Sequence, residues 1–249
     1  MHHLHVPGDS PVHRLAPEAK LVGLALYVST VALAPRRSVA VFIVAAVALA
    51  VVAGLARLGP RTMVVRLVPV APFLAFALLV PFVAGGERTE VLGLRLSVEG
   101  LWAAGTIGAK ALLGASAAIV LTATTPIPAI LRGLAVLRVP AVLVSILAFT
   151  VRYLDLLADQ LGRMRDAMTA RAHDPRWLWQ ARPIASSAGA LFVRSYERGE
   201  RVHLAMLARG FTGAVPVLDI RRAARTEWAA ALAPALAVSA ALVVMPVLR

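Results

Sequence analysis

Long apolar stretches separated by short charged connections make up most of the chain. Five of them approach the length of about 20 residues that a membrane-spanning helix needs. They cover residues 21–34, which is short, 39–56, 67–84, 101–125 and 228–248. A sixth apolar run, 139–151, is too short for a complete span and predicts a buried or interfacial helix. The pattern predicts an all-α, polytopic helical membrane protein with about five transmembrane helices.

The pattern changes after residue 151. Residues 152–225 hold 13 arginines and 7 acidic residues, so this segment predicts a cytoplasmic module placed between spans. The chain is therefore divided into three parts. They are an N-terminal membrane domain at 1–151 with about four spans and the short helix 139–151, coupling helices at 152–225, and a C-terminal transmembrane helix at 226–249.

Two amphipathic helices are predicted inside the charged module. Apolar residues at alternating steps of three and four place five side chains on one face of the first helix. These are Leu154, Leu157, Leu161, Met164 and Met168. The second helix is expected to begin near Ser186 or Ser187, with Ser195, Gly199, Val202 and Met206 on one face. Glu197 and Arg201 are four residues apart, acid first, which predicts an exposed ion pair.

Both predicted helices end in the same short motif. Ala167-Met168-Thr169-Ala170-Arg171 returns 38 residues later as Ala205-Met206-Leu207-Ala208-Arg209. Residues that stop a helix follow each arginine, so each guanidinium is expected to project from a helix end. A single arginine there would be explained by the helix dipole. Two such arginines favour docking into pockets of a partner, where a guanidinium can bind carboxylates with two parallel hydrogen bonds.

Composition supports the membrane assignment and excludes other classes. Of the 249 residues, 59% are hydrophobic and 16% are charged, whereas soluble domains have roughly a quarter charged residues. The net charge of +13 is explained by basic cytoplasmic loops rather than by nucleic-acid binding. No cysteine is present, which excludes disulfides and thiolate metal sites.

Charge in the connections predicts the orientation. The connection 57–66 has three arginines and no acid and is expected in the cytoplasm, whereas 85–100 has three glutamates and is expected outside. The N-terminus is then cytoplasmic, and its first 20 residues do not resemble a cleavable signal peptide.

Several polar residues within or beside the spans stand out singly. Lys110 lies inside the fourth span and is expected to avoid lipid, either by pairing with a partner subunit or by reaching the external surface. Pro69, Pro72 and Pro81 predict a bent or irregular third span.

The sequence offers no metal or catalytic site. The histidines of the N-terminal segment, His2, His3 and His5, are interpreted as part of a solvated tail, so no residue is assigned as a metal ligand. No P-loop and no H-E-x-x-H pair is present, and no catalytic residue is assigned.

The motifs resemble those of the T components of energy-coupling factor transporters, the CbiQ/EcfT family. Ala208-Arg209-Gly210 fits the Ala-Arg-Gly signature of that family, and Ala170-Arg171-Ala172 fits it except at Ala172. Residues 10–20 and 194–211 look most like the cobalt branch. The resemblance implies that the two arginines engage grooves on two ABC-type ATPase subunits.

The resemblance also implies the remaining partners. ATP and Mg would be bound by the ATPases. Cobalt would be bound by a small substrate-binding membrane protein, a CbiM-like S component. In one form of the complex, a CbiN-like subunit accompanies this S component. The chain would hydrolyse nothing itself and would support cobalt uptake for cobalamin biosynthesis in the bacterial cell membrane. Nickel, biotin or another vitamin stay open as substrates. Two rival functions also stay open: an ordinary ABC importer permease, and a membrane enzyme acting on lipid, for which Asp155, Asp159 and Asp166 would be essential.

Overall fold

Thirteen helices and strands follow one another along the chain in the computed structural model, which describes residues 6, 8–85, 88–91, 94–171, 182–211, 213 and 222–247. The helices are α1 (Pro11–Arg14), α2 (Pro17–Leu33), α3 (Val39–Leu55), α4 (Pro60–Leu67), the 3₁₀ turn η2 (Val68–Val70), α5 (Ala71–Val83), α6 (Val98–Thr124), α7 (Ile127–Val136), α8 (Ala141–Ala170), α9 (Arg182–Leu207) and α10 (Arg225–Val247). Two short antiparallel strands, β1 (Arg88–Val91) and β2 (Leu94–Ser97), pair from Arg88 with Ser97 to Val91 with Leu94. The predicted all-α, polytopic membrane-protein fold is confirmed, with this hairpin as an unpredicted addition.

Four of the described helical segments are long and apolar enough to cross a membrane. They are Pro60–Val83, Val98–Thr124, Ala141–Ala170 and Arg225–Val244. Three of them correspond to predicted spans. The other two predicted spans form α2 and α3, which have 17 residues each and are therefore about 26 Å long, at the lower limit for a span.

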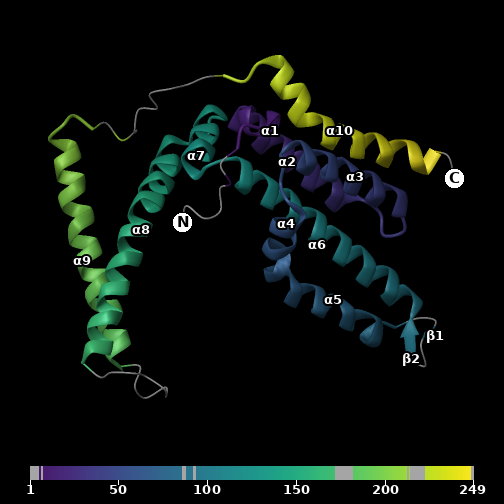
Figure 1. Ribbon diagram of the computed structural model, residues 1–249, viewed down its shortest axis with the longest axis horizontal. Helices are drawn as coiled ribbons and strands as arrows, with labels where there is room; N and C mark the ends of the chain where they lie inside the picture. The colour runs from purple at the N-terminus through teal and green to yellow at the C-terminus, as the bar shows by residue number, and fades with distance from the viewer. Residues whose placement is uncertain are drawn as a thin grey trace. The chain divides into compact units, whose positions relative to one another are not determined.

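The predicted irregularity of the third span is confirmed. A 3₁₀ turn at Val68–Val70 separates α4 from α5, and the helical axis changes direction there (Figure 1). Pro69 and Pro72 lie in the first turns of η2 and α5, where a missing N–H removes no helical hydrogen bond, whereas Pro81 lies inside α5.

The run 139–151 is not a short separate helix. It forms the first part of α8, which continues without a break for 30 residues into the charged module. The prediction that this run is too short for a complete span is wrong, because Ala141–Ala170 is long and apolar enough to cross a membrane. Burial within the chain is wrong as well, since Val142, Leu143 and Ile146 are 61%, 51% and 54% exposed. The module boundary predicted at Arg152 thus falls within a continuous helix.

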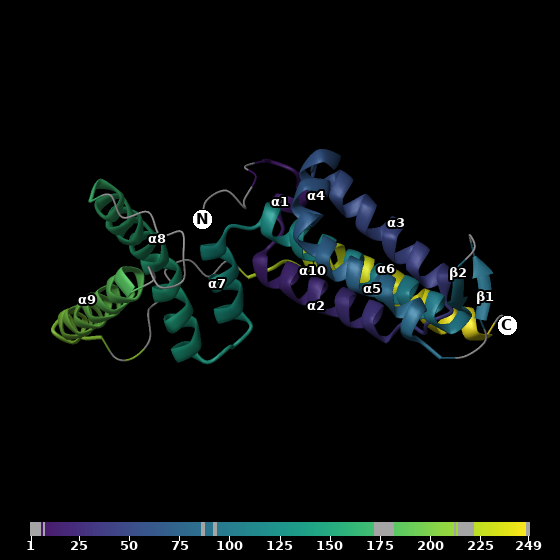
Figure 2. The same ribbon diagram turned by 90° about the horizontal axis from the view of Figure 1, so that it is seen from below.

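The chain forms two compact units. The core unit consists of His2–Gly133 and Ile220–Arg249, and the hairpin unit consists of Leu134–Asp219. In the core unit α2, α3, α6 and α10 lie side by side (Figures 1 and 2) around a cluster that includes Tyr27, Val41, Leu113 and Val238. The Tyr27 hydroxyl donates to the carbonyl oxygen of Ala45 at 2.9 Å, so this buried polar group is satisfied.

Close packing joins α2 to α10. A Cβ placed on Gly23 would lie 2.3 Å from the carbonyl oxygen of Ala231, so only glycine allows the two backbones to approach this closely. The backbones of these two helices are therefore in direct contact within the core unit.

Candidate functional site

The helices α8 and α9 form an antiparallel hairpin in which the end of α8 meets the start of α9 (Figure 1). The Ser187 hydroxyl lies 3.7 Å from the sulfur of Met168 and donates to it. All five residues of the stripe predicted on α8 are half-buried, namely Leu154, Leu157, Leu161, Met164 and Met168. These five side chains therefore share one half-buried face of α8.

The face predicted on α9 is half-buried at three of its four positions. Ser195, Val202 and Met206 are half-buried, whereas Gly199 is exposed and Arg198 takes its place along the contact face. The predicted start near Ser186 or Ser187 is wrong, because α9 begins at Arg182. Pro183 is compatible with a first helical turn, where its missing N–H has no helical partner in any case.

The Ala208-Arg209-Gly210 motif ends α9 in a defined way. The N–H of Gly210 donates to the carbonyl oxygen of Leu207 at 2.9 Å, and the N–H of Phe211 donates to the carbonyl oxygen of Met206 at 3.0 Å. This pair of bonds is a Schellman motif, which requires a left-handed residue after the helix. Gly210 supplies it with φ +81°. Arg209 is thus the C-cap residue of α9, directly before the left-handed Gly210.

Arg171 has an equivalent place at the end of α8. It is the C-cap residue, and its N–H donates to the carbonyl oxygen of Met168 at 3.0 Å. Ala172, the third position of this motif, lies outside the described residues. Both guanidiniums follow the last helical turn, where the partial negative charge of the helix dipole favours a cation.

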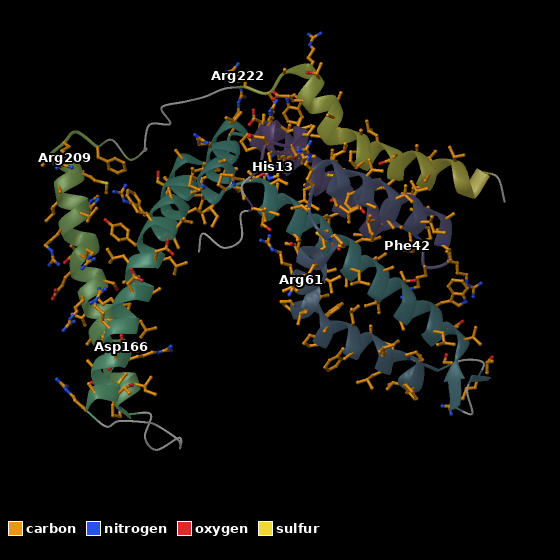
Figure 3. The ribbon with its side chains drawn as sticks, in the orientation of Figure 1. His13, Phe42, Arg61, Asp166, Arg209 and Arg222 are labelled. Carbon is orange, nitrogen blue, oxygen red and sulfur yellow. The ribbon has the colours of Figure 1, made fainter. Side chains whose placement is uncertain are left out.

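The two arginines lie at opposite ends of the hairpin. Arg171 follows the end of α8, which lies against the start of α9, whereas Arg209 follows the far end of α9, a helix of 26 residues. At 1.5 Å per residue, the two ends of α9 are about 39 Å apart. Figure 3 labels Arg209 at one end of the hairpin and Asp166 near the other. One small ligand cannot contact both guanidiniums.

Both arginine side chains lie at the surface of the part of the chain that the structure describes. Arg171 and Arg209 are exposed, and within the described residues neither guanidinium has a hydrogen-bond or ion-pair partner. By contrast, Arg201 lies 3.8 Å from Glu197 in the predicted surface pair, with the two side chains 68% and 55% exposed. An exposed pair of this kind contributes little to stability.

Lys110 has a structural role that its sequence context did not predict. Its ammonium donates to the carbonyl oxygen of Ala32 at 2.6 Å. Ala32 is in the last turn of α2, where carbonyl oxygens have no partner within the helix. Lys110 of α6 therefore joins two helices of the core unit.

The described residues contain no cluster of three or more side chains suited to hold a metal ion. His13 is engaged through both ring nitrogens: Nδ1 lies 2.7 Å from the Ser10 hydroxyl, and Nε2 lies 3.0 Å from the Val6 carbonyl oxygen. His2, His3 and His5 lie outside the described residues. Asp155, Asp159 and Asp166 are exposed on α8.

Sequence reasoning missed two buried charges in the first turn of α2. Glu18 is 2% exposed and Lys20 is 8% exposed. The Glu18 carboxylate accepts a hydrogen bond of 2.8 Å from the N–H of Ala223. The Lys20 ammonium donates to the Thr125 hydroxyl at 3.1 Å. Charged residues directly before the apolar run that starts at Leu21 were the available signal, but the partners Ala223, Thr124 and Thr125 are more than 100 residues away.

Comparison with known proteins gives a consistent result. The family described as cobalt transport protein, CbiQ, matches residues 8–217, which include both arginine-ended helices. The energy-coupling factor transporter transmembrane protein EcfT of Thermotoga maritima is 26% identical over 222 residues, 85% of this chain and 81% of the relative. The cobalt transport protein CbiQ of Rhodobacter capsulatus is 37% identical over 105 residues, 42% of this chain and 43% of the relative. The nickel permease LarQ of Lactiplantibacillus plantarum is 34% identical over 90 residues, 36% of this chain and 33% of the relative.

Proposed function

Because this chain belongs to the CbiQ family of cobalt transport proteins, whose relatives include transmembrane components of energy-coupling factor transporters, we propose that it passes ATP-driven motion from two ATPase subunits to a substrate-binding membrane protein. The chain itself would be a non-catalytic subunit. ATP and Mg would be bound by the ATPases, and the transported ion by the substrate-binding partner.

One observation carries this proposal. Arg171 and Arg209 are exposed, and the helix ends that they follow lie about 39 Å apart, the length of α9. A pair of docking points at this separation suits two separate subunits better than a single pocket. Each arginine would bind carboxylates in a groove of one ATPase, and the planar guanidinium would resist sliding when the ATPases move. Because the end of α8 contacts the start of α9 through Met168 and Ser187, force applied at Arg171 would reach α9.

The substrate-binding partner would take the exposed apolar surface of the hairpin unit. Val142, Leu143 and Ile146 on α8 and Phe192 and Tyr196 on α9 are all more than half exposed. An apolar surface of this kind is typical of a protein or lipid contact. The partner expected here is an S component resembling CbiM, with a CbiN-like subunit in one version.

Cobalt is the proposed substrate, in support of cobalamin biosynthesis. Its support is the family description and the cobalt transport protein of Rhodobacter capsulatus. Similarity to a nickel permease keeps nickel as the second candidate. Uptake of biotin or another vitamin, and the function of an ordinary ABC importer permease, rank below these two.

The proposed location is the bacterial cell membrane, with the N-terminus and the helices α8 and α9 reaching the cytoplasm. The support is charge: residues 57–66, which end in α4, carry three arginines and no acid, whereas 85–100 carries three acids and two arginines. The membrane-embedded part would then be the core unit together with the apolar start of α8.

The test is ATP-dependent uptake of labelled cobalt into vesicles that hold this chain with its candidate partners. Arg171→Glu combined with Arg209→Glu is expected to abolish uptake while the chain still inserts. The matched control is Arg165→Glu combined with Arg201→Glu, which reverses two exposed charges on the same helices away from their ends and is expected to transport normally. Uptake of nickel alone would change the substrate, whereas uptake indifferent to the first pair would refute the coupling role.

A further inference from the structure

The hairpin unit is inserted into the core unit, and the chain on both sides of the insertion contacts Glu18: α7 at the backbone of Glu18, and the returning connection at its carboxylate. The chain leaves the core unit after Gly133 and has returned to it by Ala223. A Cβ on Gly133 would lie 3.0 Å from the backbone nitrogen of Glu18, so the outgoing connection packs directly on this residue. The N–H of Ala223, on the returning connection, donates to Glu18 Oε1 at 2.8 Å.

Burial of the Glu18 carboxylate costs free energy, because it removes the charged group from water. Glu18 is only 2% exposed, and a buried carboxylate is expensive unless hydrogen bonds satisfy it. No lysine or arginine of the described chain forms an ion pair with it. Its hydrogen bond from the N–H of Ala223 is therefore a charge-assisted one in a poorly hydrated site, where such a bond is strong.

The returning connection is held at the next residue as well. The N–H of Ala224 donates to Glu227 Oε2 at 2.8 Å, which caps the start of α10. The position of the chain at 223–224 is thus fixed just before α10 begins. Because α10 packs tightly on α2 through Gly23 and Ala231, a displacement of the returning connection reaches both helices.

We propose that Glu18 is a positioning residue for energy coupling, which holds the outgoing and returning connections of the hairpin unit together on the start of α2. This inference rests on the proposed function. Motion of α8 and α9 then enters the core unit through one fixed point instead of being lost as sliding of two independent connections. Without the carboxylate the ATPases still dock and turn over, but less of their motion reaches the substrate-binding partner.

The test compares Glu18→Ala with Glu18→Gln in the assembled transporter. The alanine variant is expected to keep near-native ATP hydrolysis and to lose about tenfold in substrate taken up per ATP hydrolysed. Glutamine keeps an oxygen acceptor for Ala223 and is expected to restore most of the coupling. Glu197→Ala, which removes an exposed glutamate, is the control and should have native coupling. Native uptake per ATP in Glu18→Ala would overturn the inference.

A second measurement does not depend on transport. The chain has no cysteine, so a pair of introduced cysteines is labelled without background. Arg132→Cys and Thr226→Cys replace exposed residues, one on the outgoing side and one on the returning side, and each carries one spin label. The distance distribution between the labels is expected to be narrow in the native background, broad with Glu18→Ala and narrow again with Glu18→Gln. An unchanged distribution in Glu18→Ala overturns the inference even if that variant fails to assemble. Absence of uptake by the native complex would instead count against the proposed function.

Discussion

The ammonium group of Lys20 lies 3.1 Å from the hydroxyl of Thr125, which is 105 residues away. The same group donates to the carbonyl oxygens of His13 and Thr124, both at 3.3 Å. All three of its protons are therefore used, and they join α1, the start of α2 and the end of α6. This cation stabilises the core unit through neutral acceptors.

Replacing Lys20 by methionine should destabilise the core unit by about 1–3 kcal/mol. Thr124 is buried in the last turn of α6, where its carbonyl oxygen has no helical partner, so losing the donor leaves it unsatisfied. Thermal unfolding of the purified chain in detergent measures the change. Thr125→Val removes one acceptor and keeps the other two bonds, so it should cost clearly less. Equal stability of Lys20→Met and the native chain would contradict this role.

Gly210→Ala should loosen the end of α9. Its φ of +81° is costly for any residue with a Cβ, by roughly 1–2 kcal/mol. Hydrogen exchange of the Gly210 and Phe211 amides is expected to become about tenfold faster or more. Gly199→Ala is the matched control, because that glycine is inside the helix with open space around it, and alanine there should stabilise α9. Faster exchange in both variants would refute the assignment.

Local patterns predicted the elements that depend on local interactions. The stripe from Leu154 to Met168 follows from helical periodicity, and the stop at Gly210 follows from its freedom to adopt positive φ. The resemblance to the CbiQ family is confirmed because it rested on motifs at such positions. The ion pair of Glu197 and Arg201 was predictable for the same reason.

Features that depend on distant partners were not predictable. Glu18 and Ala223 are 205 residues apart, and no periodicity marks them as neighbours. Lys110 was recognised as costly, but its acceptor is a backbone oxygen of Ala32, and a backbone group leaves no trace in a sequence. The start of α9 was placed too late because the serines at 186 and 187 are typical caps, while Pro183 fits a first turn equally well.

Lys110→Met should cost stability without changing transport by the protein that remains folded. The substitution leaves the Ala32 carbonyl oxygen without its 2.6 Å donor, and a loss of about 1 kcal/mol is expected because the lysine is half-exposed. Lys110→Arg keeps donors near that oxygen and should recover part of the loss. The measurements are the melting temperature in detergent and uptake per correctly inserted chain. Loss of uptake at unchanged melting temperature would instead indicate a contact with a partner subunit.

Arg171 and Arg209 should contribute independently to ATPase binding. Sites that are about 39 Å apart and share no partners have additive free energies, generally within about 0.5 kcal/mol. If Arg171→Glu and Arg209→Glu each weaken binding of the ATPase subunits by about tenfold, the double variant should weaken it by about a hundredfold. Titration of the ATPases onto the immobilised chain measures all four affinities, with Arg165→Glu as the charge-matched control.

Docking through one arginine instead of two makes a different prediction for the same cycle. If only one arginine bound an ATPase and the other served only the helix dipole, reversing the second would cost roughly 0.3–1 kcal/mol in helix stability and nothing in binding. The double variant would then equal the stronger single variant. Because Gly210 fixes the end of α9 and Ala172 replaces glycine after α8, Arg209 is expected to have the larger single effect. A measurable loss of affinity for the ATPases from Arg171→Glu alone would therefore be the strongest support for docking through both arginines.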